Sequence, residues 1–594
     1  MPRFQALRRL LRDDETHLVE LTRHFFARFF DNEFVSQKGE STLGVAQFLI
    51  LLGLPGVFYF FFVYTAYADM AKLRPDLFDL TSMRDELGFV CLSMLVIGLL
   101  ALLEWDAFFP DRPDFLTLIP LPLHARNIFL AKTAALVWFL FLFATAVGGP
   151  SSFLFPLAAS GGTHLTTGGL CGWMVVHGLS VGAASVFSFF FFVALEGMLL
   201  TVLSYRWFER VSAYIQGLLI ASLLVLSLLV SKVMDNLPAL VRNHGPLTRW
   251  LPPLWFLGLY RAMLRYSGPA YLPLAHRALL GLAVVLGISI ATYLASYRRH
   301  LRRALEAGVE SPSEPWRVGR VLRRLAQQVF LREPLERANF SFVFKTMLGG
   351  RRHRLLFSAY TGVGMALALE SLAALLSRGA AVTPPERAAI LLSIPLILSF
   401  FALSGMRLIF EIPAEVRANW IFQLTEQRTS PELLSGVRKA MIILGMIPIL
   451  TLVFPIYALH MSYGEAVAGF LLDCILSLIL IELMLLRFRK VPFTCSYLAS
   501  KSGNRAVWIA CWLIFSSYAY TLARAEAWAL RHPTELVVSL AFLLAGLSWL
   551  RVYNHRFLRQ GIPLVFEEEP EPVVQTLDLS HSALDRRARQ PEGK

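Results

Sequence analysis

Charged residues are scarce in this sequence, and their scarcity argues against a soluble fold. Asp, Glu, Lys and Arg make up 16% of the 594 residues, whereas 56% of the residues are hydrophobic. A typical soluble domain has about 25% charged residues. Many stretches reach the length of about 20 apolar residues that a helix needs to cross the hydrocarbon core of a membrane. The composition therefore predicts an all-α integral membrane protein with many spans.

Motifs of nucleotide, metal and disulfide chemistry are absent as well. No G-x-x-x-x-G-K-[ST] sequence occurs, so the chain lacks a phosphate-binding loop and is not expected to hydrolyse ATP. The five cysteines are scattered without a Cys-x-x-Cys pair, which argues against a zinc site and a disulfide framework. We predict no catalytic residues, no metal ligands and no cofactor held by this chain. The first apolar run begins near Leu43, too far along the sequence for a cleavable signal peptide.

Lys and Arg are concentrated between two long apolar regions. Residues 298–354 contain fourteen Lys or Arg and five Glu, so this connector carries +9 of the net charge of +14. In a soluble chain such a charge would suggest nucleic acid. Basic segments between spans are, however, normally retained in the cytoplasm. We therefore predict a cytosolic connector, and we expect membrane lipid rather than nucleic acid as a partner.

Hydropathy predicts about twelve transmembrane helices, six on each side of the connector. The predicted spans are about 43–68, 87–104, 128–149, 172–203, 211–232 and 276–297, then 355–377, 388–410, 437–459, 465–486, 506–523 and 534–551. The predicted parts of the chain are a cytosolic N-terminus with an elbow helix (1–42), a first half (43–297), the connector with a second elbow helix (298–354), a second half (355–551) and a cytosolic, largely disordered tail (552–594). Lys/Arg placement predicts a multi-pass protein of the inner membrane with both termini in the cytoplasm.

Two segments between spans are unusual. Residues 234–274 carry four arginines, although the span count places them on the outer side. The aromatic and proline-rich run from Trp250 to Phe256 predicts short interfacial or re-entrant helices there instead of a full span. Residues 150–169 have no Asp, Glu, Lys or Arg and are rich in Gly, Ser and Thr, so we expect a loop.

The two halves share three features in the same order. Each half begins with a phenylalanine-rich entry, has a loop from a glutamate to a lysine after its second span, and carries Glu-x-Met-Leu-Leu in its fourth span. The corresponding positions are Phe25–Phe34 and Phe340–Phe344, Glu104–Lys132 and Glu411–Lys439, and Glu196 and Glu482. Because both halves have the same predicted polarity, the pattern indicates a parallel repeat of two six-helix halves.

These features resemble the permeases of ATP-binding-cassette (ABC) transporters of the type-2 exporter class. In that family an elbow helix lying in the membrane interface precedes six spans. A cytosolic loop after the second span touches the ATPase, and a broken aromatic element lies between the fifth and sixth spans. The matching segments are the elbow 21–35, the coupling loop 105–127, the broken element 234–274, the second elbow and entry 337–354 and the second coupling loop 411–436. The second half has only residues 524–533 between its last two spans, so it departs from the family by lacking the broken element.

The resemblance implies a single-chain permease that exports a substrate across the inner membrane. The energy would come from a separate soluble ABC ATPase, in two copies, which would bind the ATP and Mg. The residues that the resemblance assigns to the ATPase-coupling loops are Glu104, Asp106, Asp114, Arg126, Glu411, Glu415 and Arg417.

Four acidic residues fall inside apolar runs: Glu196, Glu370, Asp473 and Glu482. Each costs roughly 2.5–3.5 kcal/mol at the centre of a membrane on insertion scales, so each is expected to face protein or water. Such residues either contact a transport path or form structural hydrogen bonds between helices. Lys132 and Lys439 begin the third spans, where they either anchor the helix by snorkelling or pair with the glutamates of the preceding loops.

Two other functions remain open at this point. A proton- or ion-coupled secondary transporter would use the intramembrane carboxylates and would need no ATPase. A membrane transferase would bind magnesium pyrophosphate with paired aspartates. The pairs Asp76/Asp79 and Asp111/Asp114 are, however, predicted on opposite sides of the membrane, which disfavours a transferase.

Overall fold

The computed structural model consists of helices. It describes residues 18–27, 29, 46–58, 60–61, 67, 75–108, 125–160, 166–203, 205–235, 237, 246–264, 271–306, 331, 333–378, 383–414, 419–425, 431–494, 515, 519–561 and 563–564. The predicted tail beyond residue 564, most of loop 105–127 and the central part of the connector lie outside the described residues.

Ten of the described helices are long and apolar enough to cross a membrane. They are α3 (Pro75–Leu103), α5 (Ala125–Ser160), α6 (Thr167–Val202), α7 (Tyr205–Asp235), α11 (Tyr271–Glu306), α14 (Arg351–Arg378), α15 (Pro384–Ile409), the continuous unit of α17 (Pro431–Met441), η4 (Ile442–Met446) and α18 (Ile447–His460), α19 (Tyr463–Met484) and α21 (Pro533–Leu558). The prediction of a multi-pass, all-α membrane protein is confirmed. Each of the ten overlaps one predicted span. The other two predicted spans, 43–68 and 506–523, lie partly outside the described residues.

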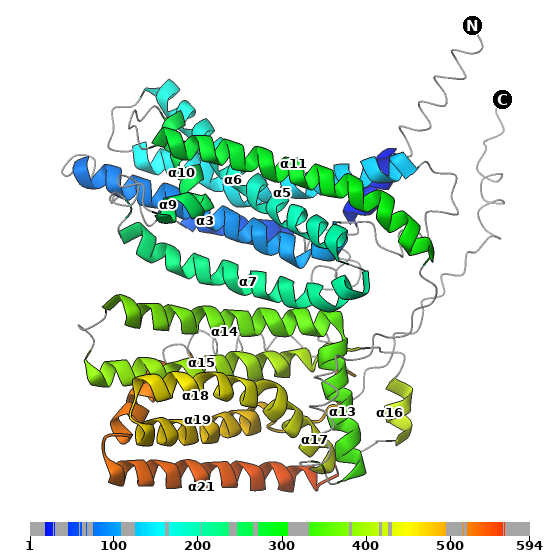
Figure 1. Ribbon diagram of the computed structural model, residues 1–594, viewed down its shortest axis with the longest axis vertical. Coiled ribbons are helices and arrows are strands. Elements are labelled where there is room, and N and C mark those ends of the chain that lie inside the picture. Colours follow the sequence, from blue (N-terminus) through cyan, green and yellow to red (C-terminus); the bar gives the residue numbers. More distant parts are fainter. Residues whose placement is uncertain are drawn as a thin grey trace, which may run out of the picture.

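The long helices run side by side in two groups (Figure 1). The first-half helices α3 to α11 form one group and α14 to α21 form the other, with α13 (Pro334–Gly349) crossing one end of the second group. We name this end, where α11 finishes and α13 lies, the connector end. The opposite end, which holds α9 (Pro246–Trp250), α10 (Pro252–Met263) and the turn between α18 and α19, is the far end.

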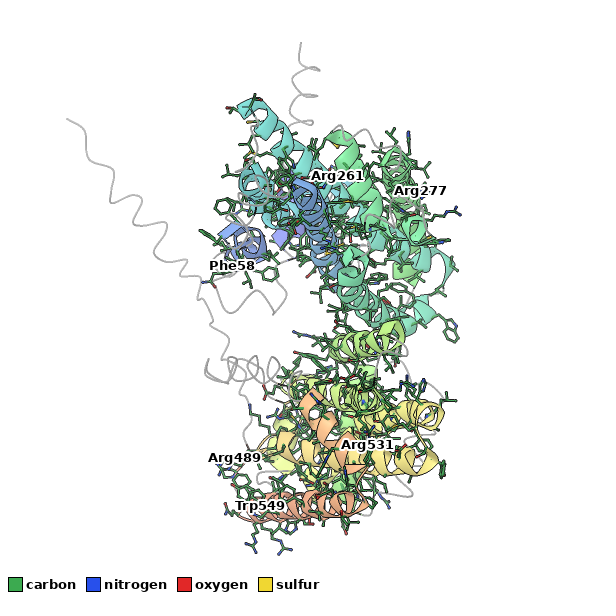
Figure 2. All side chains as sticks on the ribbon, turned by 90° about the vertical axis from the view of Figure 1, so that its left-hand side faces the viewer. Phe58, Arg261, Arg277, Arg489, Arg531 and Trp549 are labelled. Carbon is green, nitrogen blue, oxygen red and sulfur yellow. The ribbon has the colours of Figure 1, made fainter. Side chains whose placement is uncertain are left out.

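The two groups meet through α7 and α14, which have the most extensive contact of any two helices described (Figures 1 and 2). Small residues line this seam. A Cβ atom on Gly217 would lie 2.0 Å from the Cβ of Ser358, and one on Gly362 would lie 3.0 Å from the Cβ of Ala221. Glycine therefore allows two backbones to approach closely, as is typical of helix contacts within membranes. Arg354 adds a cation–π contact, 5.5 Å from the ring of Tyr214.

Phenylalanines build the interior of the first half. The helical residues 18–27 bury Leu21 and Phe25 against α5, and Phe29 packs 4.8 Å from Phe139 between ring centroids. The predicted elbow at 21–35 is therefore helical over its first part and packs on the third span of its half. Residues 30–35 lie outside the described residues.

The prediction of a loop over 150–169 is wrong for most of its length. Helix α5 continues to Ser160 through Pro150 and Pro156, and α6 begins at Thr167. In hydrocarbon or a protein interior, unpaired backbone groups are so costly that helix is retained despite residues of low helix propensity. Serine side chains help, since Ser151 and Ser152 both donate hydrogen bonds to the carbonyl of Gly148.

A second correction concerns the start of the second span, which was predicted at residue 87. Helix α3 begins at Pro75, so Asp79, Asp85 and Glu86 lie on helical turns. Proline is well suited to the first turn of a helix, and acidic residues near that end interact favourably with the helix dipole. The predicted short helices within 234–274 are confirmed as α9 and α10, which lie beside α3 and α11 at the far end.

Candidate functional site

Several charged side chains are buried within the helix bundles. Among the described residues, those less than 9% exposed include Glu86, Lys132, Glu196, Arg261, Glu336, Asp473, Glu482 and Glu526. A buried charge is stable only when it is paired, hydrogen-bonded or neutralised. The partners of each therefore indicate which of them are structural and which are candidates for function.

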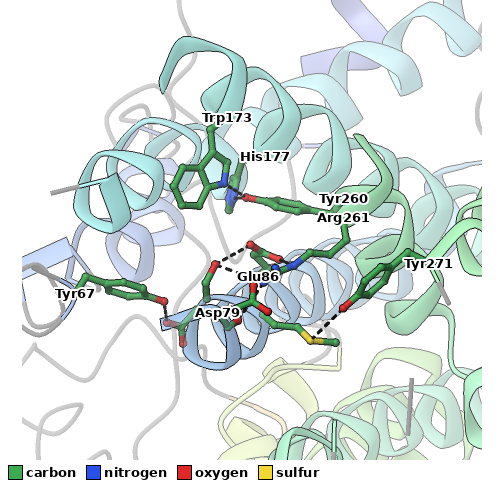
Figure 3. A network of polar contacts seen from close by, with 11 residues as sticks. Tyr67, Asp79, Glu86, Trp173, His177, Tyr260, Arg261 and Tyr271 are labelled. Atoms are coloured by element: carbon green, nitrogen blue, oxygen red, sulfur yellow. Dashed lines mark hydrogen bonds and ion pairs between the residues drawn. The ribbon is translucent and has the colours of Figure 1, made fainter. Parts of the chain in front are cut away.

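Arg261 forms the most completely paired charge network (Figure 3). Its Nε lies 2.6 Å from Oε2 of Glu86, and its Nη1 lies 2.6 Å from Oδ1 of Asp79. Ser82 donates a hydrogen bond of 2.9 Å to the other Glu86 oxygen. The side chains of Arg261 and Glu86 are 1% and 0% exposed. Arg261 is one of the four arginines that the predicted topology places on the outer side of the membrane. Its charge is cancelled by Asp79 and Glu86 of α3.

A second polar chain ties α10 to α6 and α5. The indole of Trp173 donates a 2.8 Å hydrogen bond to the hydroxyl of Tyr260. His177 lies 3.2 Å from the same hydroxyl through Nδ1 and 3.3 Å from Oγ of Ser151 through Nε2. Figure 3 shows this chain next to the Arg261 network. Together they fix the broken element to three different spans, so we interpret both as structural.

Glu482 lies near the connector end of α19 and is surrounded by donors. Arg438 Nε is 2.8 Å from its Oε1, and Arg551 Nε is 3.3 Å from the same oxygen. Asn554 Nδ2 lies 3.1 Å from both its Oε2 and its backbone carbonyl. Of the two roles expected for this residue, the contacts favour the structural one: Glu482 joins α17, α19 and α21.

Asp473 lies on the same helix but has a different environment. Its carboxylate is 1% exposed and accepts a 2.8 Å hydrogen bond from the hydroxyl of Tyr457 on α18. Its Oδ1 has no hydrogen-bond partner within the described part of the chain, and neither oxygen of the 5% exposed Glu526 has one. Tyr457, which donates to Asp473, lies in one apolar cluster with Ala523 and Ala527, so the segment of Glu526 packs beside Asp473.

The other two intramembrane candidates differ from this pair. Glu196 is 2% exposed near the end of α6, and it has an interaction within the bundle. Glu370 is half-buried on α14. The structure does not bring Glu196, Glu370 and Glu482 into a common site. Asp473 is joined by Glu526, which the sequence reasoning did not single out.

The expected ATPase-coupling residues are only partly described. Glu411 forms a 2.9 Å ion pair with Arg407, one helical turn earlier, and its side chain is 19% exposed. Glu104 follows the last turn of α3 and is half-buried. The remaining candidates have side chains or whole residues outside the described part: Asp106, Asp114, Arg126, Glu415 and Arg417. Their role stays a prediction.

Lys132 and Lys439 each contact the helix that precedes the first span of their half. Lys132 is 5% exposed, with its Nζ 5.4 Å from the ring centre of Phe25. Lys439 Nζ lies 2.6 Å from Oε1 of Glu336 on α13, and Ser435 donates a hydrogen bond to the same oxygen. The partner of Lys439 is therefore an acid of α13 and not the expected glutamate of the preceding loop, Glu411.

Sequence reasoning missed Arg261, Glu86 and Glu526 as interacting residues. Arg261 and Glu86 are 175 positions apart in the chain, and no local pattern joins them. Glu526 follows a predicted span and lies between Arg524 and Arg531 in the sequence. A charged residue in such a position is typical of a solvent-exposed loop. A signal was available for Arg261, since an arginine in an aromatic run on the outer side needs a nearby counter-charge.

Comparisons with known proteins give no relative: no family model, no curated protein and no solved structure matches this chain.

Proposed function

We propose that the chain is the permease of an ABC exporter. In this proposal the two groups of helices are the halves of one translocation unit, and a separate ATPase supplies the energy. Two copies of that ATPase would bind ATP and Mg and dock on residues 105–127 and 411–436. Closure of the ATPases would rock one half against the other.

The observation that carries the proposal is a contact made in both halves. Helical residues 18–27 pack on α5, where Lys132 faces the ring of Phe25. Helix α13 packs on α17, where Lys439 pairs with Glu336. In each half, a helix that precedes the first span thus covers the beginning of the third span. This arrangement is what a parallel repeat of elbow and bundle requires.

The helix order in the two halves supports the same view. In the first half α6 packs on α3, α5 and α11, and in the second half α19 packs on α15, α18 and α21. These are the second, third and sixth predicted spans of each half. The seam between α7 and α14 is lined by small residues, which suits a boundary at which the halves could rock.

Crosslinking to the partner tests the proposal. A photoreactive residue placed at Glu415 or Asp114 should capture a protein with a phosphate-binding loop, identified by mass spectrometry. The matched control is the same residue at Glu465, which lies in the first turn of α19 at the far end, where it forms a capping box with Ser462. Capture of no ATPase from either loop, or equal capture from Glu465, would refute the assignment.

A proton- or ion-coupled transporter is the second candidate. It requires intramembrane carboxyl groups that can change their charge during transport. Glu482 is poorly suited because it is paired with two arginines. Asp473 is better suited, since it forms no ion pair within the described residues. Transport by the purified chain alone, without an ATPase, would favour this candidate.

A further inference from the structure

Asp473 lies close to the midpoint of a helix that crosses the membrane. It is the eleventh of the 22 residues of α19, so it lies about 15 Å along the helix axis from Tyr463 at a rise of 1.5 Å per residue. A hydrocarbon core is about 30 Å thick. The carboxyl group is thus near mid-membrane depth, where an ionisable residue is rare and commonly functional.

Glu526 reaches Asp473 from the helical residues 519–530. A Cβ atom on Gly469 would lie 3.8 Å from Cδ1 of Leu530, so these residues mark a point where the segment contacts α19. The two run in opposite directions, since α19 starts at the far end and the segment finishes there. Asp473 lies one helical turn from Gly469 toward the connector end, and Glu526 lies one turn from Leu530 in the same direction. The two acids therefore face each other.

No cation neutralises this pair within the described residues. Neither Asp473 nor Glu526 forms an ion pair there, and three of their four carboxyl oxygens have no hydrogen-bond partner. The surrounding cluster is apolar and includes Ala519, Ala523 and Ala527. Two adjacent buried carboxylates repel each other strongly in such surroundings, so they do not both ionise.

We infer that Asp473 and Glu526 form a proton-binding site at the middle of the membrane. One proton taken from solvent forms an O–H bond on Glu526. This hydroxyl donates to Oδ1 of Asp473, which stays ionised and accepts the Tyr457 hydrogen bond through Oδ2. The pair then carries one negative charge instead of two. This arrangement supplies a partner to Oδ1 and to one Glu526 oxygen, and it does not depend on the proposed ATPase.

The described residues place few other polar groups near the pair. Tyr457 comes from α18, and Cys474 follows Asp473 on α19. Ser477 lies one turn below Asp473 and donates to Ser399 of α15 at 3.3 Å. Arg524, on the segment of Glu526, lies over the ring of Tyr520 at 5.9 Å. None of these groups supplies a counter-charge for two carboxylates, because Arg524 forms no ion pair with either.

Labelling with dicyclohexylcarbodiimide, which reacts with protonated carboxyl groups in apolar surroundings, tests the site on the purified full-length chain. At neutral pH we expect an adduct on Glu526 or Asp473, located by mass spectrometry, with a yield that falls as the pH rises. Glu482 is the matched control, because it is equally buried on the same helix but is paired with arginine. The variant E526Q should lose the adduct at both acidic positions.

The pH dependence of unfolding tests the same site without relying on access of the label. A proton held more tightly by the folded than by the unfolded chain makes stability fall as the pH rises. E526Q keeps the shape of a protonated glutamate and should therefore lose that part of the pH dependence of unfolding while remaining folded. Three labelling results would overturn the inference: no adduct on either acid of the pair, an adduct on Glu482 as strong as on the pair, or protection of the pair from the carbodiimide by sodium or potassium ions. An unchanged pH dependence of unfolding in E526Q would overturn it as well.

Discussion

Two sites with buried carboxyl groups, one in each half, differ in the partners of those groups. In the first half, Glu86 is buried against Arg261, which the broken element α10 carries into the bundle. In the second half, residues 519–533 contain no such element, and the two helical segments are joined directly at Arg531 and His532. Two buried acids there, Asp473 and Glu526, form no ion pair with the described residues, whereas Glu482 is paired with Arg438 and Arg551. A buried acid is held as an ion pair where a neighbouring helix brings an arginine to it, as α10 does for Glu86.

Charge reversal of one buried acid in each half should separate the two sites most sharply. In E86K the new ammonium group faces Arg261 in a buried site, and we expect a loss of stability of more than about 4 kcal/mol. In E526K the ammonium group faces Asp473 and supplies the missing cation, so the protein should remain folded. Yields of monodisperse protein by size-exclusion chromatography compare the two. Equal loss in both variants would contradict the difference between the halves.

Removal of the Arg261 cation should greatly reduce stability, and a second substitution should restore it. R261M leaves the Glu86 carboxylate buried and unpaired, which costs about 3–5 kcal/mol when one partner of a buried ion pair is removed. The double variant R261M/E86Q removes the orphaned charge and should recover most of the loss. Thermal unfolding in detergent measures both. No recovery in the double variant would mean that packing, and not charge, holds α10.

The two buried acids of α19 offer a comparison within one helix. E482Q weakens charge-assisted hydrogen bonds to Arg438 and Arg551 and should cost about 1.5–3 kcal/mol. D473N preserves the acceptor for Tyr457 and removes a charge that has no cationic partner, so its cost should be smaller. Thermal unfolding of both variants under identical conditions tests the order. A D473N variant less stable than E482Q would indicate a cation next to Asp473.

The smallest expected effect concerns the hydroxyl that holds Asp473. Y457F removes one buried hydrogen bond to a carboxyl group and should cost about 1–2 kcal/mol. Y463F, at an exposed position in the same half, is the control and should be close to neutral. Equal melting temperatures of Y457F and the unchanged protein would show that Asp473 does not depend on this donor.

Sequence reasoning located the membrane helices well and the loops less well. All ten candidate spans overlap predicted ones, because the length of an apolar run is a local property. The uncharged stretch 150–169, rich in Gly, Ser and Thr, suggested a loop, but residues 150–160 belong to helix α5. Short helices within 234–274 were predicted from the aromatic and proline content alone, and α9 and α10 are such helices.

Buried acidic residues were partly predictable. Asp473 and Glu482 were recognised as costly within apolar runs, and both are buried. Their different roles depend on contacts with α17, α18, α21 and the segment of Glu526, which no local pattern contains.

The sequence by itself determined that the chain is a helical membrane protein, where most of its spans lie, and that a basic connector separates two apolar regions. Hydrophobicity and charge density along the chain suffice for these conclusions, because the membrane acts on each segment separately. Only the tertiary structure decided which buried acid has an arginine, which has another acid, and which glycines let α7 and α14 approach. Those outcomes depend on residues far apart in sequence meeting in a medium of low polarity, where each charge is stable only with a suitable neighbour.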